Sequence, residues 1–239
     1  MLLFFSFGIF LNCIAQPSAE SDNSVALAIV YDTSGSMAEL VRDGSNKMSP
    51  KFVIANRALT SVINRLQDVA HSKTAPRKVF CSLVVFNGTG AREAVPFDEL
   101  NEEKLISWVK AFQKPSGATP LGEAIRTAAK PLLQSKAKHK HILVLTDGIN
   151  TVGPQPSEVI PSLKTDAERN GSGLSLHFIA FDVAAKVFEP VKKLHATVVG
   201  AANEKELNTQ LDFIVEKKIL LEEEEAPVKT DKNSPIKLK

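Results

Sequence analysis

The first clear pattern along the chain is an unbroken run of apolar residues, Val25–Tyr31, followed at once by small polar residues. A run of this length without polar alternation is typical of a strand buried on both faces of a parallel sheet. Further runs of strand length follow, separated by segments whose apolar residues recur at helical spacing. The later strands are expected at 78–86, 91–97, 141–145, 174–181 and 196–199.

Helices are expected between these strands. Ser49 and Pro50 predict the start of one, with serine as the N-cap and proline as the first helical residue. Thr119 and Pro120 open another helix. The remaining helical patterns lie near 105–112, before Asn170, at 187–194 and at 204–221.

Alternating strands and helices predict an α/β fold with a doubly wound, mostly parallel six-stranded sheet and helices on both faces. Segment 91–97 follows its predecessor through the turn pair Asn87-Gly88, so it is expected to be an antiparallel strand at the sheet edge. The chain of 239 residues is 44% hydrophobic and 23% charged, with a formal charge of +2. This is ordinary globular composition without a basic stripe, and we expect no nucleic-acid partner.

Three segments differ in character along the chain. Residues 1–15 carry no charge and are too short for a comfortable membrane span, which indicates an export signal cleaved near Ala15. Residues 24–221 form the expected domain, and the charged, proline-containing tail 222–239 is expected to be disordered. The protein is therefore expected to be secreted or periplasmic, or membrane-anchored if the first segment is not cleaved.

Candidate chemistry gathers where the central strands end. Asp32, Ser34 and Ser36 follow the first strand, Thr119 begins a helix, and Asp147 follows a later strand. In doubly wound sheets, binding sites lie at the carboxyl ends of the strands. Hydroxyl and carboxylate oxygens suit Mg²⁺, with Ca²⁺ or Mn²⁺ as alternatives, and do not suit copper or zinc. A cation held in this way would favour an anionic oxygen from a partner.

These residues match a known pattern. DTSGSM resembles the DxSxS motif of von Willebrand factor type A domains, and the threonine of GATPLGEAI and the aspartate of LVLTDG follow in the same order. The resemblance covers 24–221 and implies a metal-ion-dependent adhesion site. It implies that Ser34, Ser36 and Thr119 coordinate the ion while Asp32 and Asp147 act largely through water. It further implies a non-enzymatic module that binds a protein partner presenting Glu or Asp.

Other interpretations remain open. The main alternative is a magnesium-dependent phosphotransferase similar to the haloacid dehalogenases, with Asp32 as the nucleophile. Ser34 argues against it, because phosphatases of that class carry an acid at this place. A third possibility is an assembly role in which a metal only stiffens the loops. Each motif taken alone also fits simple turn or capping chemistry.

Two further features have weaker interpretations. His139 and His141 would share one face of a strand, as a metal pair or, more commonly, as a solvated strand entrance. Asp182 follows another apolar run and is expected at the rim of the site.

Overall fold

The computed structural model describes residues 24–221, and β1 (Val25–Tyr31) lies in the middle of its main sheet. The strand order is β5-β4-β1-β6-β7-β8, and every pair is parallel except β4 with β5. The predicted sheet, including its antiparallel edge strand, is therefore confirmed. The other five strands are β4 (Val79–Asn87), β5 (Gly90–Glu99), β6 (His139–Thr146), β7 (Gly173–Phe181) and β8 (Thr197–Ala201).

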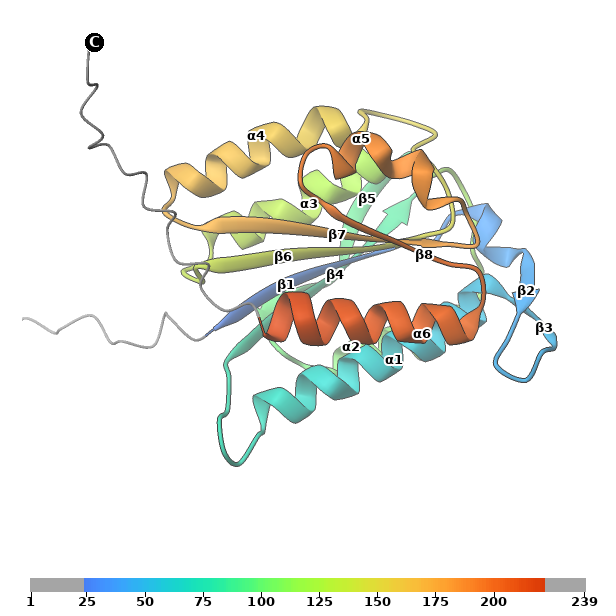
Figure 1. Ribbon diagram of the computed structural model, residues 1–239, viewed down its shortest axis with the longest axis horizontal. Coiled ribbons are helices and arrows are strands. Elements are labelled where there is room, and N and C mark those ends of the chain that lie inside the picture. The colour runs from blue at the N-terminus through green and yellow to red at the C-terminus, as the bar shows by residue number, and fades with distance from the viewer. Residues whose placement is uncertain (1–23, 222–239) are drawn as a thin grey trace, which may run out of the picture.

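Helices cover both faces of the sheet (Figure 1). One layer contains α1 (Lys51–Ala70), α2 (Glu102–Ala111) and α6 (Glu204–Phe213). The other contains α3 (Leu121–Gln134), α4 (Pro156–Arg169) and α5 (Glu189–Lys192). Each layer encloses its own apolar core against the sheet, as the doubly wound fold requires.

The two faces of β1 differ in side-chain size. Leu27, Ile29 and other odd-numbered residues pack against the core beneath α1 and α6. On the opposite face, Ala26 and Ala28 pack in the core beneath α3. That helix also contributes small side chains to this core, among them Ala128. Small side chains on both surfaces let a helix lie close to the sheet, so the α3 layer is held near the central strand.

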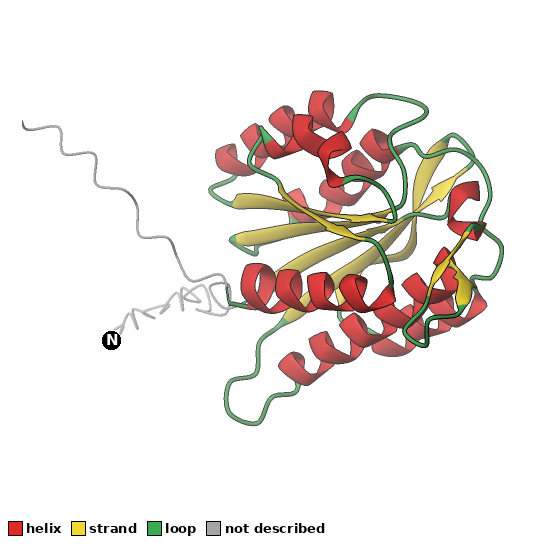
Figure 2. Ribbon diagram, turned by 45° about the vertical axis from the view of Figure 1, so that its right-hand side comes forward, coloured by secondary structure: helices red, strands yellow, loops and turns green. Residues whose placement is uncertain are grey.

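The start of α1 differs from the prediction by one residue. Pro50, and not Ser49, occupies the N-cap position, and the helix begins at Lys51. Ser49 instead lies in β3 (Met48–Pro50), which pairs with β2 (Leu40–Arg42), and its hydroxyl donates to Asp43. This two-stranded hairpin follows a short 3₁₀ turn, η2 (Gly35–Ala38), and was not predicted. Figure 2 shows it as the short pair of yellow strands at the edge of the molecule.

The C-terminal helix also differs in detail from the prediction. The α-helical part ends at Phe213, and the chain continues as a π-helical stretch, η4 (Ile214–Leu220). The short helix expected at 187–194 is divided into η3 (Ala185–Phe188) and α5. No helix within 24–221 is long and apolar enough to cross a membrane. The expected signal at 1–15 and the expected tail at 222–239 lie outside the described residues.

A pair of buried histidines lies in the sheet beneath the C-terminal helix layer. His141 Nδ1 and His177 Nε2 are 3.3 Å apart, and the two rings are stacked. Burial, together with the charges of His177, His139 and Arg77, lowers the pKa of His141 to about 3. Burial, with the charge of Lys218, lowers the pKa of His177 to about 4. A solvated strand entrance is therefore wrong for His141, which is fully buried.

Lowering the pH from 7 to 5 is expected to destabilise the protein through this pair. Unfolded histidines bind protons below about pH 6.5, whereas His141 and His177 stay neutral in the folded state until about pH 4. The unfolded state thus binds more protons in this window, and the free energy of unfolding falls as the pH falls. The variant His141→Gln/His177→Gln should lose about 2 to 4 kcal/mol less than the parent over this interval. Chemical denaturation at each pH measures the free energy of unfolding, and the variant His71→Gln, at an exposed histidine, is the control. If the free energy of unfolding of the parent and of the double variant fell equally between pH 7 and pH 5, the prediction would be wrong.

Candidate metal centre

The site begins where β1 and β6 end side by side. Tyr31 is in register with Leu145, and the amide of Asp32 donates to the carbonyl of Leu145 at 3.0 Å. The carboxylate of Asp32 is fully buried, with Oδ1 accepting from the amide of Ser34 at 2.8 Å and Oδ2 accepting from the hydroxyl of Thr146. Asp32 thus ties the loop after β1 to the end of β6.

The electrostatics of Asp32 follow from this burial. Burial raises the pKa of the carboxyl to about 6, against the lowering effect of hydrogen bonds from Ser34 and Thr146. The nearby charge of Asp147 raises the pKa as well. A buried carboxylate with both oxygens already bonded is poorly placed to attack a substrate. Its geometry suits an anchor for the loop rather than a nucleophile.

Two serine hydroxyls and a carboxylate form the centre of the site. Ser34 Oγ and Ser36 Oγ are 3.1 Å apart, and Ser36 Oγ donates to Asp147 Oδ1 at 2.7 Å. Neighbouring oxygen ligands of an octahedral ion with bonds of about 2.0–2.1 Å lie roughly 2.9 Å from each other. The spacing of these oxygens is that of hydrogen bonds and is also compatible with neighbouring ligands of one small cation.

Thr119 reaches the same edge from the start of α3. Its amide donates to Thr151 Oγ1 at 2.8 Å, and the amide of Thr151 donates back to the carbonyl of Thr119 at 3.0 Å. A Cβ placed on Gly148 would lie 3.9 Å from Thr119 Oγ1, so this hydroxyl lies against the residue that follows Asp147. The structure joins four of the five expected side chains in one hydrogen-bonded group and places Thr119 beside it.

Backbone contacts fix the loop that precedes Thr119. The amide of Gly35 donates to the carbonyl of Gly117 at 3.1 Å, and the amide of Ser116 donates to the carbonyl of Thr33 at 2.9 Å. Gly117 has a φ of +90°, a conformation that residues with a Cβ rarely adopt. The loops after β1 and before α3 are thereby held together at main-chain level.

Sequence reasoning missed Lys51, the first residue of α1. Its ammonium is within 2.9 Å of Glu39 and 3.1 Å of both Asp147 and Asp182. Burial alone would lower the pKa of Lys51, but hydrogen bonds to the three carboxylates raise it well above its ordinary value. A cation at a helix N-terminus opposes the macrodipole, and this mismatch was the signal available in the sequence.

Asp182 was expected at the rim, and the structure places it there, partly exposed and facing Lys51. It has a φ of +53°, a left-handed conformation that aspartate tolerates better than most residues. In residues 24–221 no three histidine, cysteine, aspartate or glutamate side chains are arranged to hold a metal ion. Any cation at this edge would therefore depend on the hydroxyl oxygens.

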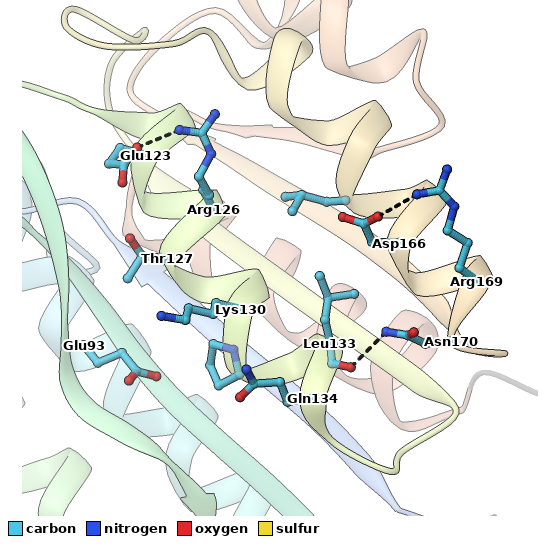
Figure 3. Close-up of a pocket in the computed structure, with 12 residues that line it drawn as sticks. Glu93, Glu123, Arg126, Thr127, Lys130, Leu133, Gln134, Asp166, Arg169 and Asn170 are labelled. Carbon is cyan, nitrogen blue, oxygen red and sulfur yellow. Dashed lines mark hydrogen bonds and ion pairs between the residues drawn. The ribbon is translucent and has the colours of Figure 1, made fainter.

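A separate hollow of about 770 Å³ lies between α3 and α4 (Figure 3). Four of its charged side chains pair within their own helices, Arg126 with Glu123 at 3.1 Å and Arg169 with Asp166 at 3.4 Å. Such exposed pairs contribute little energy and are common on helix surfaces. The hollow is open and shares no residue with the site at the sheet edge.

A doubly wound sheet with a hydroxyl-rich site at the carboxyl ends of its strands is typical of one class of binding domains. The family model of the von Willebrand factor type A domain matches residues 27–214. The chain therefore belongs to that family. No curated protein matches it significantly.

Solved structures share this fold at low sequence identity. The PilB minor pilin from Streptococcus sanguinis is 18% identical, with a TM-score of 0.58 over 81% of this chain and 61% of its own. The vWF domain of the type V pili tip protein Mfa5 from Porphyromonas gingivalis is 14% identical, with a TM-score of 0.60 over 82% and 95%. Proximal thread matrix protein 1 from the mussel byssus, with a zinc-occupied MIDAS motif, is 16% identical, with a TM-score of 0.59 over 82% and 48%.

This chain thus spans less than two thirds of the length of the pilin it matches. The family match does not support the phosphotransferase alternative. The carboxylate of Asp32 is buried and both of its oxygens accept hydrogen bonds, which also argues against a role as the nucleophile of a phosphotransferase.

Replacing Lys51 with methionine is expected to destabilise the protein in a chelating buffer. The side chain of Asp147 is inaccessible to solvent, and without the ammonium its charge is left buried and uncompensated. Breaking a buried pair in this way costs about 3–5 kcal/mol of unfolding free energy. Urea denaturation in EDTA measures the loss.

A second variant keeps this test specific to the charge. In Lys51→Met/Asp147→Asn the orphaned charge is gone, so this variant should be more stable than Lys51→Met alone. Exposed Lys110→Met serves as the control for removing a lysine elsewhere. Equal stability of the single and double variants would show that the ion pair with Asp147 is not the cause.

Proposed function

We propose that this chain is a divalent-cation-dependent protein-binding module of the adhesion type. Ser34, Ser36 and Thr119 coordinate the ion, while Asp32 and Asp147 act largely through water. A Glu or Asp from the partner completes the metal shell. The observation that carries the proposal is the group formed by Ser34 Oγ, Ser36 Oγ and Asp147 Oδ1, with successive separations of 3.1 and 2.7 Å.

Magnesium is the ion we infer. All the side-chain donors are hard oxygens, which suit Mg²⁺ and, with longer bonds, Ca²⁺ or Mn²⁺. The proposed shell of three hydroxyl oxygens, waters and one partner oxygen suits Mg²⁺, which takes six ligands and keeps several waters, whereas Ca²⁺ takes six to eight. Zinc in the mussel protein shows that the same fold can hold another divalent ion.

An acidic partner follows from the charges around the ion. Lys51 shares the carboxylate of Asp147, and hydrogen bonds occupy both oxygens of Asp32. Neither carboxylate is then free to bind the ion with its full charge. The cation therefore stays electrophilic and favours an anionic oxygen from outside.

We further propose that the module is not an enzyme and acts outside the cell. The structures that share its fold include pilins, a pilus adhesin and a byssus matrix protein, all of which support this setting. The predicted signal at 1–15 is consistent with export. The assembly role in which metal only stiffens the loops differs by predicting partner affinity that is equal with and without metal.

Calorimetric titration of the EDTA-stripped protein with MgCl₂ is expected to show one binding site. Ser36→Ala and Thr119→Ala each remove a coordinating oxygen and should weaken binding at least about tenfold, in line with the loss of one ligand. Ser61→Ala, an exposed serine of α1, is the matched control. Unchanged affinity in both site variants would exclude this arrangement of ligands.

The enzymatic alternative is tested on the same preparations. Hydrolysis of a generic phosphoester in magnesium, abolished by Asp32→Asn, would establish the phosphotransferase and overturn the proposal. We expect no release of phosphate above that of the Asp32→Asn variant.

A further inference from the structure

Exposed apolar side chains gather at the edge of the sheet that carries the candidate site. In residues 24–221, six large apolar side chains are more than a third exposed, namely Leu40, Met48, Ile149, Val187, Phe213 and Leu221. The first four lie in segments that follow the carboxyl ends of β1, β6 and β7 (Figure 1). Leu40, Met48 and Ile149, the apolar rim, are 56%, 55% and 54% exposed.

Two members of the apolar rim share one face of the β2–β3 hairpin. Leu40 pairs with Pro50 and Arg42 pairs with Met48, so these side chains lie on the same side of the two strands. The opposite side carries Val41, which is buried in the core. The hairpin therefore turns Val41 inward and leaves a face in solvent that carries the apolar Leu40 and Met48 together with Arg42.

This exposed face is held firmly in place. Glu39, next to Leu40, binds the ammonium of Lys51 at the base of the hairpin. At the tip, Glu204 accepts from the amide of Gly44 at 2.6 Å and pairs with Arg57 at 2.8 Å. A rigid surface loses little conformational entropy on binding, which favours a docking role over mere exposure.

Bonds within the turn add to this rigidity. The carboxylate of Asp43 accepts from the amides of Ser45 and Lys47 at 2.9 Å each and from the hydroxyl of Ser49 at 2.9 Å. These bonds lower the pKa of Asp43 to about 2, so it stays ionised and internally satisfied.

Ile149 adds a second segment, the loop after β6, to the apolar rim. It lies two residues after Asp147, whose carboxylate shares the ammonium of Lys51 with Glu39. One ammonium thus ties together the loops that carry Leu40 and Ile149. A segment bound at the cation would meet apolar side chains from both loops.

The charges on the hairpin add a second property of the partner. Glu39 pairs with Lys51, and Asp43 is satisfied within the turn. Arg42 donates only to the neutral side chain and carbonyl of Asn46, and neither Arg42 nor Lys47 forms an ion pair with another described residue. Asp43 keeps its negative charge, but Arg42 and Lys47 outnumber it, so the hairpin carries a net positive charge, complementary to an acidic segment.

We propose that the apolar rim selects a partner segment in which the metal-binding Glu or Asp is flanked by large apolar side chains. This inference rests on the proposed function, since the acid is the group that reaches the cation. Exposed apolar clusters on folded proteins mark interaction surfaces. Here the exposed apolar side chains lie in the segments after β1 and β6 that also carry Ser34, Ser36 and Asp147.

Immobilised synthetic 13-residue peptides test the proposal with the purified full chain. One peptide carries a central Glu flanked by two Leu or Phe residues on each side, and a second carries the same Glu flanked by Ser. Each has a matched peptide with Gln in place of Glu, and binding is measured in MgCl₂ and in EDTA. We expect the apolar-flanked Glu peptide to bind about tenfold tighter than the Ser-flanked one, as partial burial of a few apolar side chains would give.

Variants assign this preference to the rim. Leu40→Ser/Met48→Ser and Ile149→Ser should each bring the two Glu peptides closer in affinity, while preserving the dependence on Mg²⁺ and the preference for Glu over Gln. Phe213→Ser, which removes an exposed apolar side chain of α6, should change nothing. All these side chains are exposed, and circular dichroism confirms that the variants are folded.

The outcomes separate the two proposals. Binding that requires Mg²⁺ and Glu but ignores the flanking residues would overturn the rim and leave the proposed function standing. Unaltered apolar preference in both rim variants would do the same. Binding that is equal in EDTA, or equal for Gln and Glu, would overturn the proposed function and this inference with it.

Discussion

The parallel register of β1 between β4 and β6 is the constraint on which the rest of the molecule depends. Val25 is aligned with Val79 and His139, and Tyr31 with Val85 and Leu145, so β1 and β6 end within one residue of each other. The residues that follow then meet without any long side chain having to bridge a gap. A slip of one residue would turn the buried side chains of β1 to the other face and separate Asp32 from Thr146.

Most of the fold and the candidate site could be predicted because their signals are local. An unbroken apolar run such as Val25–Tyr31 has few structural solutions, and the polar residues after it can only lie at the strand end. Asp32, Ser34 and Asp147 were placed together by topology alone. The sequence could not reveal the hydrogen bond from Thr146 to Asp32, because a threonine ending a strand is unremarkable until its neighbour is known.

What escaped prediction depends on contacts between distant segments. The β2–β3 hairpin has strands of only three residues, and it persists because Glu39, Gly44 and Val41 are held by groups elsewhere in the chain. Lys51 reads as a surface residue of an amphipathic helix, yet three carboxylates from separate loops surround it. His141 reads as the entrance to a strand, and only the covering C-terminal helix layer makes it a core residue.

Glu204 is the first residue of the last helix, and its carboxylate holds the tip of the hairpin through Gly44. A tensile load applied along α6 would therefore reach the turn beyond β2 as well as β8, which precedes α6 in the chain. Glu39, which directly precedes β2 of the hairpin, binds the same ammonium of Lys51 as Asp147 does. A hydrogen bond, the main chain of the hairpin and two ion pairs thus connect the C-terminal helix to the carboxylate beside the two serines.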